Sequence, residues 1–94
     1  MGYIYKIYNM TNDKVYIGKT TRTVEKRFSD HIKLLKDGLH YNKKMQQDYN
    51  KNKTAFRVEK VYRVLRDEDL SDYERYFIRI NNSVKNGYNI NHGG

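Results

Sequence analysis

The chain has 94 residues, no cysteine and ten tyrosines, and its 19 lysines and arginines outnumber its 11 aspartates and glutamates, giving a formal charge of +8. A chain of this length forms at most one domain. The sequence excludes a disulfide framework and a thiolate metal site, and it has no apolar run of signal-peptide or membrane-spanning length. We therefore expect one intracellular, cytoplasmic domain over residues 1–94, with no membrane partner. A basic, tyrosine-rich surface favours nucleic acid as the partner, although surface charge also serves solubility alone.

A β-hairpin is expected at the N-terminus. Residues 3–8 and 14–18 both alternate aromatic and aliphatic side chains with polar ones, and the polar turn NMTND separates them. Tyr3 and Tyr5 then point to the same face of the first strand.

An amphipathic helix is predicted to begin after Thr21 or Thr23, either of which is a good N-cap, and to stop at Gly38. Its apolar stripe consists of Val24, Phe28, Ile32 and Leu35. Arg27 and His31 lie one turn apart beside this stripe. We expect both side chains at the rim of the core, facing a cleft.

Three more elements follow. A mostly polar helix is predicted over 42–50, with Met45 and Tyr49 as its core contacts, and a β-branched strand over 56–61. The stretch DEDLSDYERYFIRI returns to helical period, with an Asp or Ser as its cap and Glu74 at the border of its stripe. That stripe consists of Leu70, Tyr73, Phe77 and Ile80. The tail is expected to form turns and to end in a short strand. Together these elements predict an α/β (α+β) fold, a small, mostly antiparallel three-stranded sheet flanked by helices.

Five separated motifs resemble the GIY-YIG nuclease superfamily in their order along the chain. They are YIY, YIG eleven residues later, Arg27 with His31, a carboxylate in a late helix, and GYN near the end. The likeness is greatest to the catalytic domain of phage-type and intron-encoded homing endonucleases, which also place a Gly-x-His stretch like GLH before the second helix. Tyr3 stands where the family has its first glycine, but the tyrosine that carries chemistry in the family is present as Tyr5.

The resemblance implies a metal-dependent DNA endonuclease that hydrolyses phosphodiester bonds, one strand per active site. Glu74 would hold a single divalent metal, Mg²⁺ with Mn²⁺ as a substitute. Tyr5 would orient or deprotonate the attacking water. Because a free tyrosine with a pKa near 10 is a poor base at neutral pH, cations must assist it, and Arg27, Lys14 and the metal are available. Tyr16 would hydrogen-bond the scissile phosphate or the water.

Four more residues are assigned roles by the same resemblance. Arg27 would clamp the phosphate with its planar fork, and His31 would relay a proton or donate to phosphate. His40 and Asn89 are auxiliary candidates, the asparagine holding a strand or a phosphate oxygen. Each candidate also has a plain structural alternative: tyrosines in strand packing, a solvent-facing carboxylate, an arginine in a structural ion pair, a packed histidine, an asparagine in a turn. Gly18, which lacks a Cβ, would let substrate or a helix approach closely.

DNA binding is expected from basic residues that contact the phosphate backbone but read no sequence. The candidates are Arg22, Lys43, Lys44, Lys51 and Lys53. These lysines equally fit a solvated helix face. No separate DNA-binding module follows, so we expect a fragment, a protein of low specificity, or targeting by a further domain or a partner protein. We also expect the protein to be nucleoid-associated or phage-encoded, and to be a monomer or weak dimer. A non-catalytic nucleic-acid-binding module and an RNA-directed nuclease or binder are the alternatives.

Overall fold

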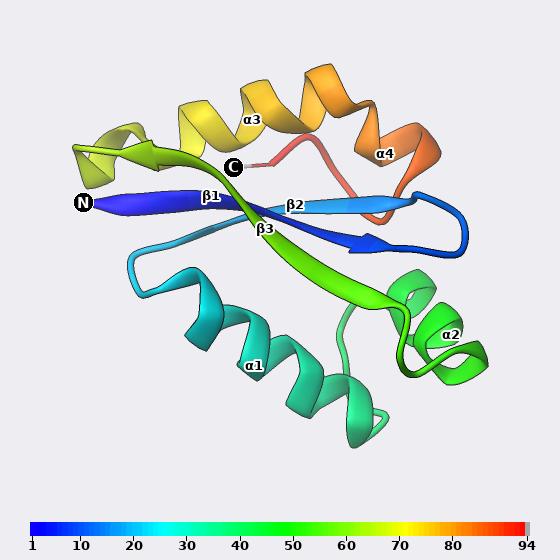
Figure 1. Ribbon diagram of the computed structural model, residues 1–94. Helices are drawn as coiled ribbons and strands as arrows, with labels where there is room; N and C mark the ends of the chain where they lie inside the picture. Colours follow the sequence, from blue (N-terminus) through cyan, green and yellow to red (C-terminus); the bar gives the residue numbers. More distant parts are fainter. Residues whose placement is uncertain (94) are drawn as a thin grey trace.

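A three-stranded antiparallel sheet forms the centre of the molecule, and helices cover both of its faces (Figure 1). The computed structural model describes residues 1–93. The strands are β1 (Gly2–Asn9), β2 (Val15–Thr20) and β3 (Phe56–Val64), in the order β2-β1-β3. This confirms the predicted sheet, with a third strand that runs beyond the expected end at residue 61.

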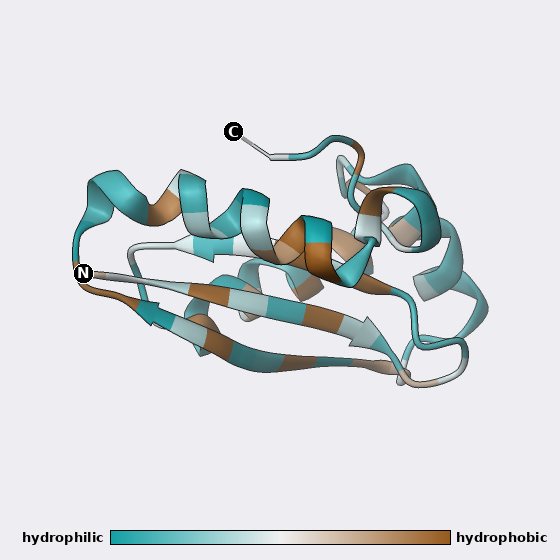
Figure 2. Ribbon diagram, turned by 90° about the horizontal axis from the view of Figure 1, so that it is seen from above, coloured by the Kyte–Doolittle hydropathy of each residue, from teal (hydrophilic) through white to brown (hydrophobic). Residues whose placement is uncertain are grey.

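The two faces of the sheet have separate hydrophobic cores. On one face lie α1 (Val24–Lys36) and α2 (Lys43–Lys51), and on the other α3 (Leu70–Asn81) and α4 (Ser83–Asn86) (Figure 1). Hydropathy alternates along the strands, as expected for strands whose successive side chains point to opposite faces (Figure 2). Tyr5 therefore belongs to the core beneath α1 and α2, whereas its neighbour Ile4 packs in the core beneath α3.

The first two helices begin at side-chain caps. The Thr23 hydroxyl accepts a hydrogen bond from the Lys26 amide at 3.2 Å, so Thr23 is the N-cap of α1. Gly38, with φ of +72°, follows the end of this helix as predicted. The Asn42 side chain caps α2 by accepting from the Met45 amide at 3.0 Å. The backbone at Asn42 is thus fixed by the helix that it starts.

The buried face of α3 differs from the prediction. Ile80 is 57% exposed, and Ile78, at 1%, lies in the core with Leu70. Leu70, Glu74 and Ile78 recur every fourth residue, so the carboxylate of Glu74 lies on the buried face and not at its border. Leu70, Tyr73 and Phe77 pack in or against this core as predicted. The prediction was wrong at Ile80 and at Glu74, because a carboxylate was not counted as a buried position. The N-cap is an aspartate, Asp69, as predicted, but its side chain makes no capping hydrogen bond.

The tail forms a one-turn helix, α4, where only turns were expected. After α4 the chain runs beside β2, and the Tyr88 amide donates to the carbonyl of Val15 at 2.9 Å. The described part of the tail, up to residue 93, contains no strand, so the expected short strand is absent there. The tail nevertheless packs against the β2 edge of the sheet, beside the clustered tyrosines.

Candidate active site

Tyr5 and Tyr16, on adjacent strands, lie side by side near the β2 edge of the sheet. Their ring centroids are 6.4 Å apart. Tyr5 pairs across the hairpin with Gly18. A Cβ built on Gly18 would lie 2.3 Å from both Cζ and Oη of Tyr5, so the ring occupies the space that any other residue would fill. The glycine makes room here for a tyrosine of the protein itself.

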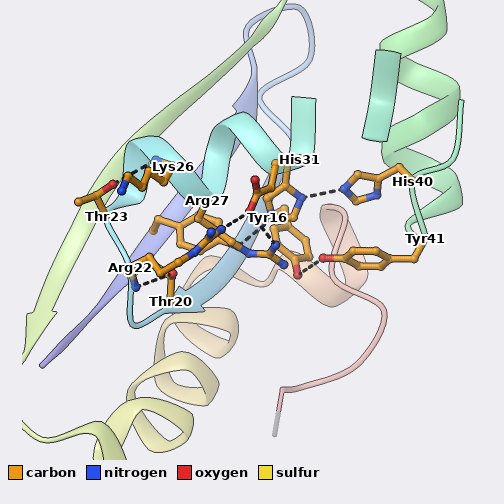
Figure 3. A network of polar contacts seen from close by, with 11 residues as sticks. Tyr16, Thr20, Arg22, Thr23, Lys26, Arg27, His31, His40 and Tyr41 are labelled. Carbon is orange, nitrogen blue, oxygen red and sulfur yellow. Dashed lines mark hydrogen bonds and ion pairs between the residues drawn. The ribbon is translucent and has the colours of Figure 1, made fainter. Parts of the chain in front are cut away.

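His31 lies deeper than the predicted rim position. Its side chain is buried, and Nε2 lies 2.8 Å from the Tyr5 hydroxyl oxygen. On the other side Nδ1 of His31 lies 2.7 Å from Nε2 of His40, which is also buried (Figure 3). Burial and the charge of Arg27 lower the pKa of His31 to about 3 and that of His40 to about 4. Both imidazoles are therefore neutral at neutral pH. They form a buried chain of hydrogen bonds that ends at the Tyr5 hydroxyl.

Arg27 lies at the rim, as predicted, and its guanidinium is directed toward the tyrosine cluster (Figure 3). Burial raises the pKa of Tyr5 to about 12, while the nearby charge of Arg27 acts in the opposite direction. Arg27 also lies 4.0 Å from the carboxylate of Asp30, which Arg22 contacts as well. Arg27 thus lies beside the Tyr5 hydroxyl. The Arg27 side chain is 30% exposed, so its guanidinium is accessible to an anion.

Tyr41 completes the cluster and was missed in the sequence. Its hydroxyl lies 3.2 Å from that of Tyr16, and its ring stacks on His40 at 4.4 Å (Figure 3). Burial, followed by this hydrogen bond, raises the pKa of Tyr16. The sequence feature that could have indicated Tyr41 is its position between the candidate residue His40 and Asn42, the cap of α2. Both neighbours are held in place, which restricts the direction of the Tyr41 side chain.

Glu74 reaches the same region from α3 on the opposite face of the sheet. Its negative charge raises the pKa of both Tyr5 and Tyr16, although burial is the larger cause in each case. Lys19, also missed in the sequence, lies 3.7 Å from the Glu74 carboxylate and donates to Ser71 at 2.6 Å. The sequence feature that could have indicated Lys19 is its position directly after the YIG motif, in the same strand as Tyr16 and at the β2 edge of the sheet.

The donor set around Glu74 fits a magnesium-like ion. Within residues 1–93 there is no group of three or more His, Cys, Asp or Glu side chains that could surround a metal. Mg²⁺ does not need such a group, since it keeps several waters and commonly uses one or two carboxylates with substrate phosphate. A single carboxylate beside an open cleft therefore suits Mg²⁺ better than it suits zinc.

Asn89 holds the edge strand. Its Oδ1 accepts from the Ile17 amide at 2.8 Å and from the Ser83 hydroxyl at 2.7 Å, and its Nδ2 donates to the Ile17 carbonyl at 2.9 Å. The side chain is buried and takes the place of a neighbouring strand on the free side of β2. Of the two predicted roles, this geometry matches the one of holding a strand.

Two clefts flank the tyrosine cluster. The larger, of about 570 Å³, includes Lys19, Arg22 and Arg27 among its lining residues, and the smaller, of about 270 Å³, is bounded by Tyr16, Glu74 and other residues. One cleft is therefore rich in cations and the other in hydroxyl and amide groups.

The remaining predicted residues lie away from the tyrosines. Lys14 is exposed in the hairpin loop, and the cation that lowers the pKa of Tyr5 is Arg27. The predicted DNA-binding lysines are all exposed, at the first turn of α2, at its end and just beyond it: Lys43, Lys44, Lys51 and Lys53. The structure brings together the predicted tyrosines, Arg27, both histidines and Glu74, and it leaves these five lysines outside the cluster.

A family model described as the GIY-YIG catalytic domain matches residues 1–89. The chain belongs to the GIY-YIG family. Tyr3 stands where the family name has its first glycine, and β1 runs through this position without the positive φ that would favour glycine. Tyr3 therefore fits an extended strand, and the pairing of β1 with β3 shifts in register only beyond it, between Ile4 and Tyr5.

The chain is similar to two viral proteins, one of which is named as an endonuclease. Intron-associated endonuclease 1 of Enterobacteria phage T4 is 38% identical over 88 residues, which cover 93% of this chain and 36% of the phage protein. The uncharacterized protein 019R of Invertebrate iridescent virus 6 is 64% identical over 31 residues, 33% of this chain and 11% of that protein. The chain thus spans well under half the length of these relatives.

Two solved structures of GIY-YIG domains share the fold. A point mutant of the catalytic domain of intron endonuclease I-TevI is 33% identical, with a TM-score of 0.91 over 100% of this chain and 98% of that one. The catalytic domain of homing endonuclease I-TevI gives a TM-score of 0.88 at 33% identity, over 97% and 99% of the two chains. The α+β fold of this chain is therefore the fold expected from its membership of the GIY-YIG family.

Proposed function

We propose that this GIY-YIG domain is a divalent-metal-dependent DNA endonuclease that hydrolyses one strand per active site. The observation that carries the proposal is that Arg27 of α1 and Glu74 of α3 both act electrostatically on Tyr5 of β1, beside Tyr16 on the edge strand β2. A hydroxyl, a fixed cation and an oxygen ligand for a metal are the groups that phosphodiester hydrolysis needs. The relatives named as endonucleases support the same reaction.

Glu74 would hold the metal, Mg²⁺ with Mn²⁺ as a substitute. When bound, the ion supplies positive charge that stabilises the pentavalent phosphate and the leaving oxygen. The Glu74 carboxylate lies 3.7 Å from the Lys19 ammonium, so a metal ion held by Glu74 would displace Lys19 from this carboxylate. Lys19 is then placed beside the ion to contact a phosphate oxygen of the bound strand.

Arg27 would bind the scissile phosphate. Its guanidinium is permanently charged and can donate two parallel hydrogen bonds to phosphate oxygens. Because it borders the cleft that Lys19 and Arg22 also line, the adjacent phosphates of the strand would follow this basic side. Tyr16, with its hydroxyl 3.2 Å from that of Tyr41, would hydrogen-bond the phosphate from the other side.

Tyr5 would orient the attacking water and, as a phenolate, accept its proton. The pKa of about 12 means that the hydroxyl is protonated in most free molecules at neutral pH. The neighbouring charge of Arg27 favours the phenolate, and a cation at Glu74 would act in the same direction by offsetting the carboxylate. In the step itself, the water oxygen bonds to phosphorus, the bond to the leaving oxygen breaks, one water proton passes to the Tyr5 phenolate, and the leaving oxygen takes a proton from solvent.

Targeting would come from outside this domain. The exposed basic residues, Arg22 in the cleft and the lysines of α2, would contact DNA backbone without reading sequence. A separate DNA-binding domain or a partner protein would then choose the site, and a monomer or weak dimer would nick first one strand and then the other. No helix within residues 1–93 has the length and apolarity needed to span a membrane.

The decisive experiment is nicking of supercoiled plasmid with Mg²⁺, Mn²⁺ or EDTA. Glu74→Gln keeps the size of the side chain and removes its charge. Its matched control is Glu59→Gln, at an exposed position on β3. We expect metal-dependent nicking in the wild type and in Glu59→Gln, and none in EDTA or in Glu74→Gln.

Three results would contradict the proposal. If Glu74→Gln nicks DNA at the wild-type rate, Glu74 does not hold the metal. Salt-sensitive DNA binding by the wild type without nicking under any metal, even after fusion to a DNA-binding domain, would favour the non-catalytic binding module. Cleavage of RNA but not DNA would indicate the RNA-directed alternative.

A further inference from the structure

A chain of buried hydrogen bonds runs from the start of α2 to the hydroxyl of Tyr5. The backbone amide of Asn42 lies 3.0 Å from Nδ1 of His40, Nε2 of His40 lies 2.7 Å from Nδ1 of His31, and Nε2 of His31 lies 2.8 Å from Tyr5 Oη. A hydrogen bond between two imidazoles has two possible directions, depending on their tautomers. The direction here is set by the first group, because a backbone N–H can only donate.

The proton positions follow one after another. His40 Nδ1 accepts from the Asn42 amide, so a neutral His40 carries its proton on Nε2 and donates it to His31 Nδ1. A neutral His31 must then carry its own proton on Nε2, where it donates to Tyr5 Oη. The opposite direction would place an Nδ1–H of His40 against the N–H of Asn42.

We propose that His40, oriented by the Asn42 amide, is a positioning residue that holds His31 in the Nε2–H tautomer, so that His31 donates a hydrogen bond to the Tyr5 oxygen. His31 then acts on Tyr5 as a donor that stabilises the phenolate. It does not take the proton of Tyr5, since the nitrogen that faces the hydroxyl is already protonated. The hydrogen of the Tyr5 hydroxyl is directed away from His31.

The surroundings keep this arrangement in place. Asn42 is fixed twice, because its Oδ1 caps α2 at the Met45 amide and its Nδ2 donates to the carbonyl of Tyr88. The ring of Tyr41 stacks on His40 at 4.4 Å. Both histidines are at most 4% exposed, and each has a lowered pKa, so the neutral forms that define the direction persist at neutral pH.

The tautomers are measured directly by long-range ¹H–¹⁵N correlation NMR on the uniformly ¹⁵N-labelled wild-type chain at pH 7. His92, exposed in the tail, is removed as His92→Gln to assign the remaining two rings. We expect both His31 and His40 to carry their proton on Nε2. A proton on Nδ1 of His31, or a charged His31 at this pH, would overturn the proposal.

A pair of substitutions at His40 tests the positioning role, which rests on the proposed nuclease activity. The amide nitrogen of His40→Gln lies about where Nε2 lies and still donates to His31, whereas His40→Leu offers no donor. We expect His40→Gln to keep the Nε2–H tautomer and most of the nicking rate. His40→Leu should give His31 a mixture of tautomers and lower the rate about 10–100-fold, as is usual when the partner of a functional histidine is lost.

The two hypotheses fail in different ways. If His40→Leu folds but keeps both the tautomer and the rate, His40 has no positioning role, and the proposal is wrong while the nuclease assignment stands. If the wild type does not nick DNA, the proposed function is wrong, and the NMR spectrum still decides the direction of the hydrogen-bond chain.

Discussion

The ring of Tyr5 lies directly across Gly18 of the neighbouring strand, with Cζ and Oη in the volume that a Cβ at that position would take. The two residues are paired in the hairpin, and Tyr5 is 1% exposed, so its ring has no free space to move into. Gly18 therefore determines where the Tyr5 hydroxyl lies relative to Arg27 and His31. A small residue on one strand positions a reactive group on another.

Gly18→Ala is expected to displace the Tyr5 ring and to lower the nicking rate about 10²-fold, the loss that a misplacement of about 1 Å can cause. The matched control is Gly38→Ala, where a Cβ meets nothing within 4 Å but the φ of +72° is strained. This control should cost about 1 kcal/mol of stability and leave the rate of the folded protein unchanged. Equal rates in the two variants would show that the position of Tyr5 does not depend on Gly18.

Tyr5→Phe keeps the ring over Gly18 and removes only the hydroxyl. If that hydroxyl orients or deprotonates the attacking water, the single-turnover rate should fall by about 10²–10⁴-fold. Tyr8→Phe, further along the same strand, is the control and should retain the wild-type rate. If the rate falls by less than about threefold, well below the usual effect of acid–base groups, Tyr5 does not activate the attacking water, and a second water takes that role.

The pH dependence of the rate distinguishes the two possible roles of Tyr5. Because its pKa of about 12 lies above the working range, the phenolate fraction rises about tenfold for each pH unit from pH 6 to pH 9. A rate that depends on the phenolate should therefore rise with a logarithmic slope near +1 in Mg²⁺. The residual rate of Tyr5→Phe should lose this slope. If the slope persists in the variant, another group, such as a metal-bound water, loses the proton.

The hairpin, the first helix and the third strand were predictable because their patterns are local. Thr23 caps α1 and Gly38 follows its end, as the sequence indicated, since caps and periodicity act within a few residues. The buried face of α3 was predicted only in part, since Leu70, Tyr73 and Phe77 pack as expected whereas Ile80 is exposed. Glu74 occupies a buried position between Leu70 and Ile78, and apolar periodicity alone cannot identify a face that includes a carboxylate.

The site was predicted as a set of residues but not as a network. The family motif led to Tyr5, His31 and His40, yet nothing in the spacing indicated that the histidines are buried in contact with each other. That contact depends on how α1 and the start of α2 pack against the sheet, which is a tertiary property. Tyr41 and Lys19 were missed because each enters the site only through this packing.

Asn89→Ala tests how the tail holds β2. The substitution leaves the amide and carbonyl of Ile17, both bonded to Asn89, without these partners. Each buried backbone group left unsatisfied costs about 1–3 kcal/mol, so the unfolding free energy in urea should fall by roughly 2–6 kcal/mol. Asn86→Ala, at an exposed position in α4, should change it by less than about 0.5 kcal/mol. Equal stability of the two variants would mean that β2 does not depend on this amide.

The buried histidine pair should make the protein less stable in acid. The pKa of His31 is about 3 in the folded chain and about 6.5 when unfolded, so between these values the unfolded state binds more protons. Stability is therefore complete above pH 6.5 and is lost progressively as the pH falls toward 3, by about 2 kcal/mol for His31 between pH 7 and pH 5. His40, whose pKa is lowered to about 4, acts in the same direction. Urea unfolding at pH 7, 6 and 5 should show this loss in the wild type and in His92→Gln, and a flatter profile in His31→Gln. A wild-type stability that does not change between pH 7 and pH 5 would mean that His31 is not held neutral in the folded protein.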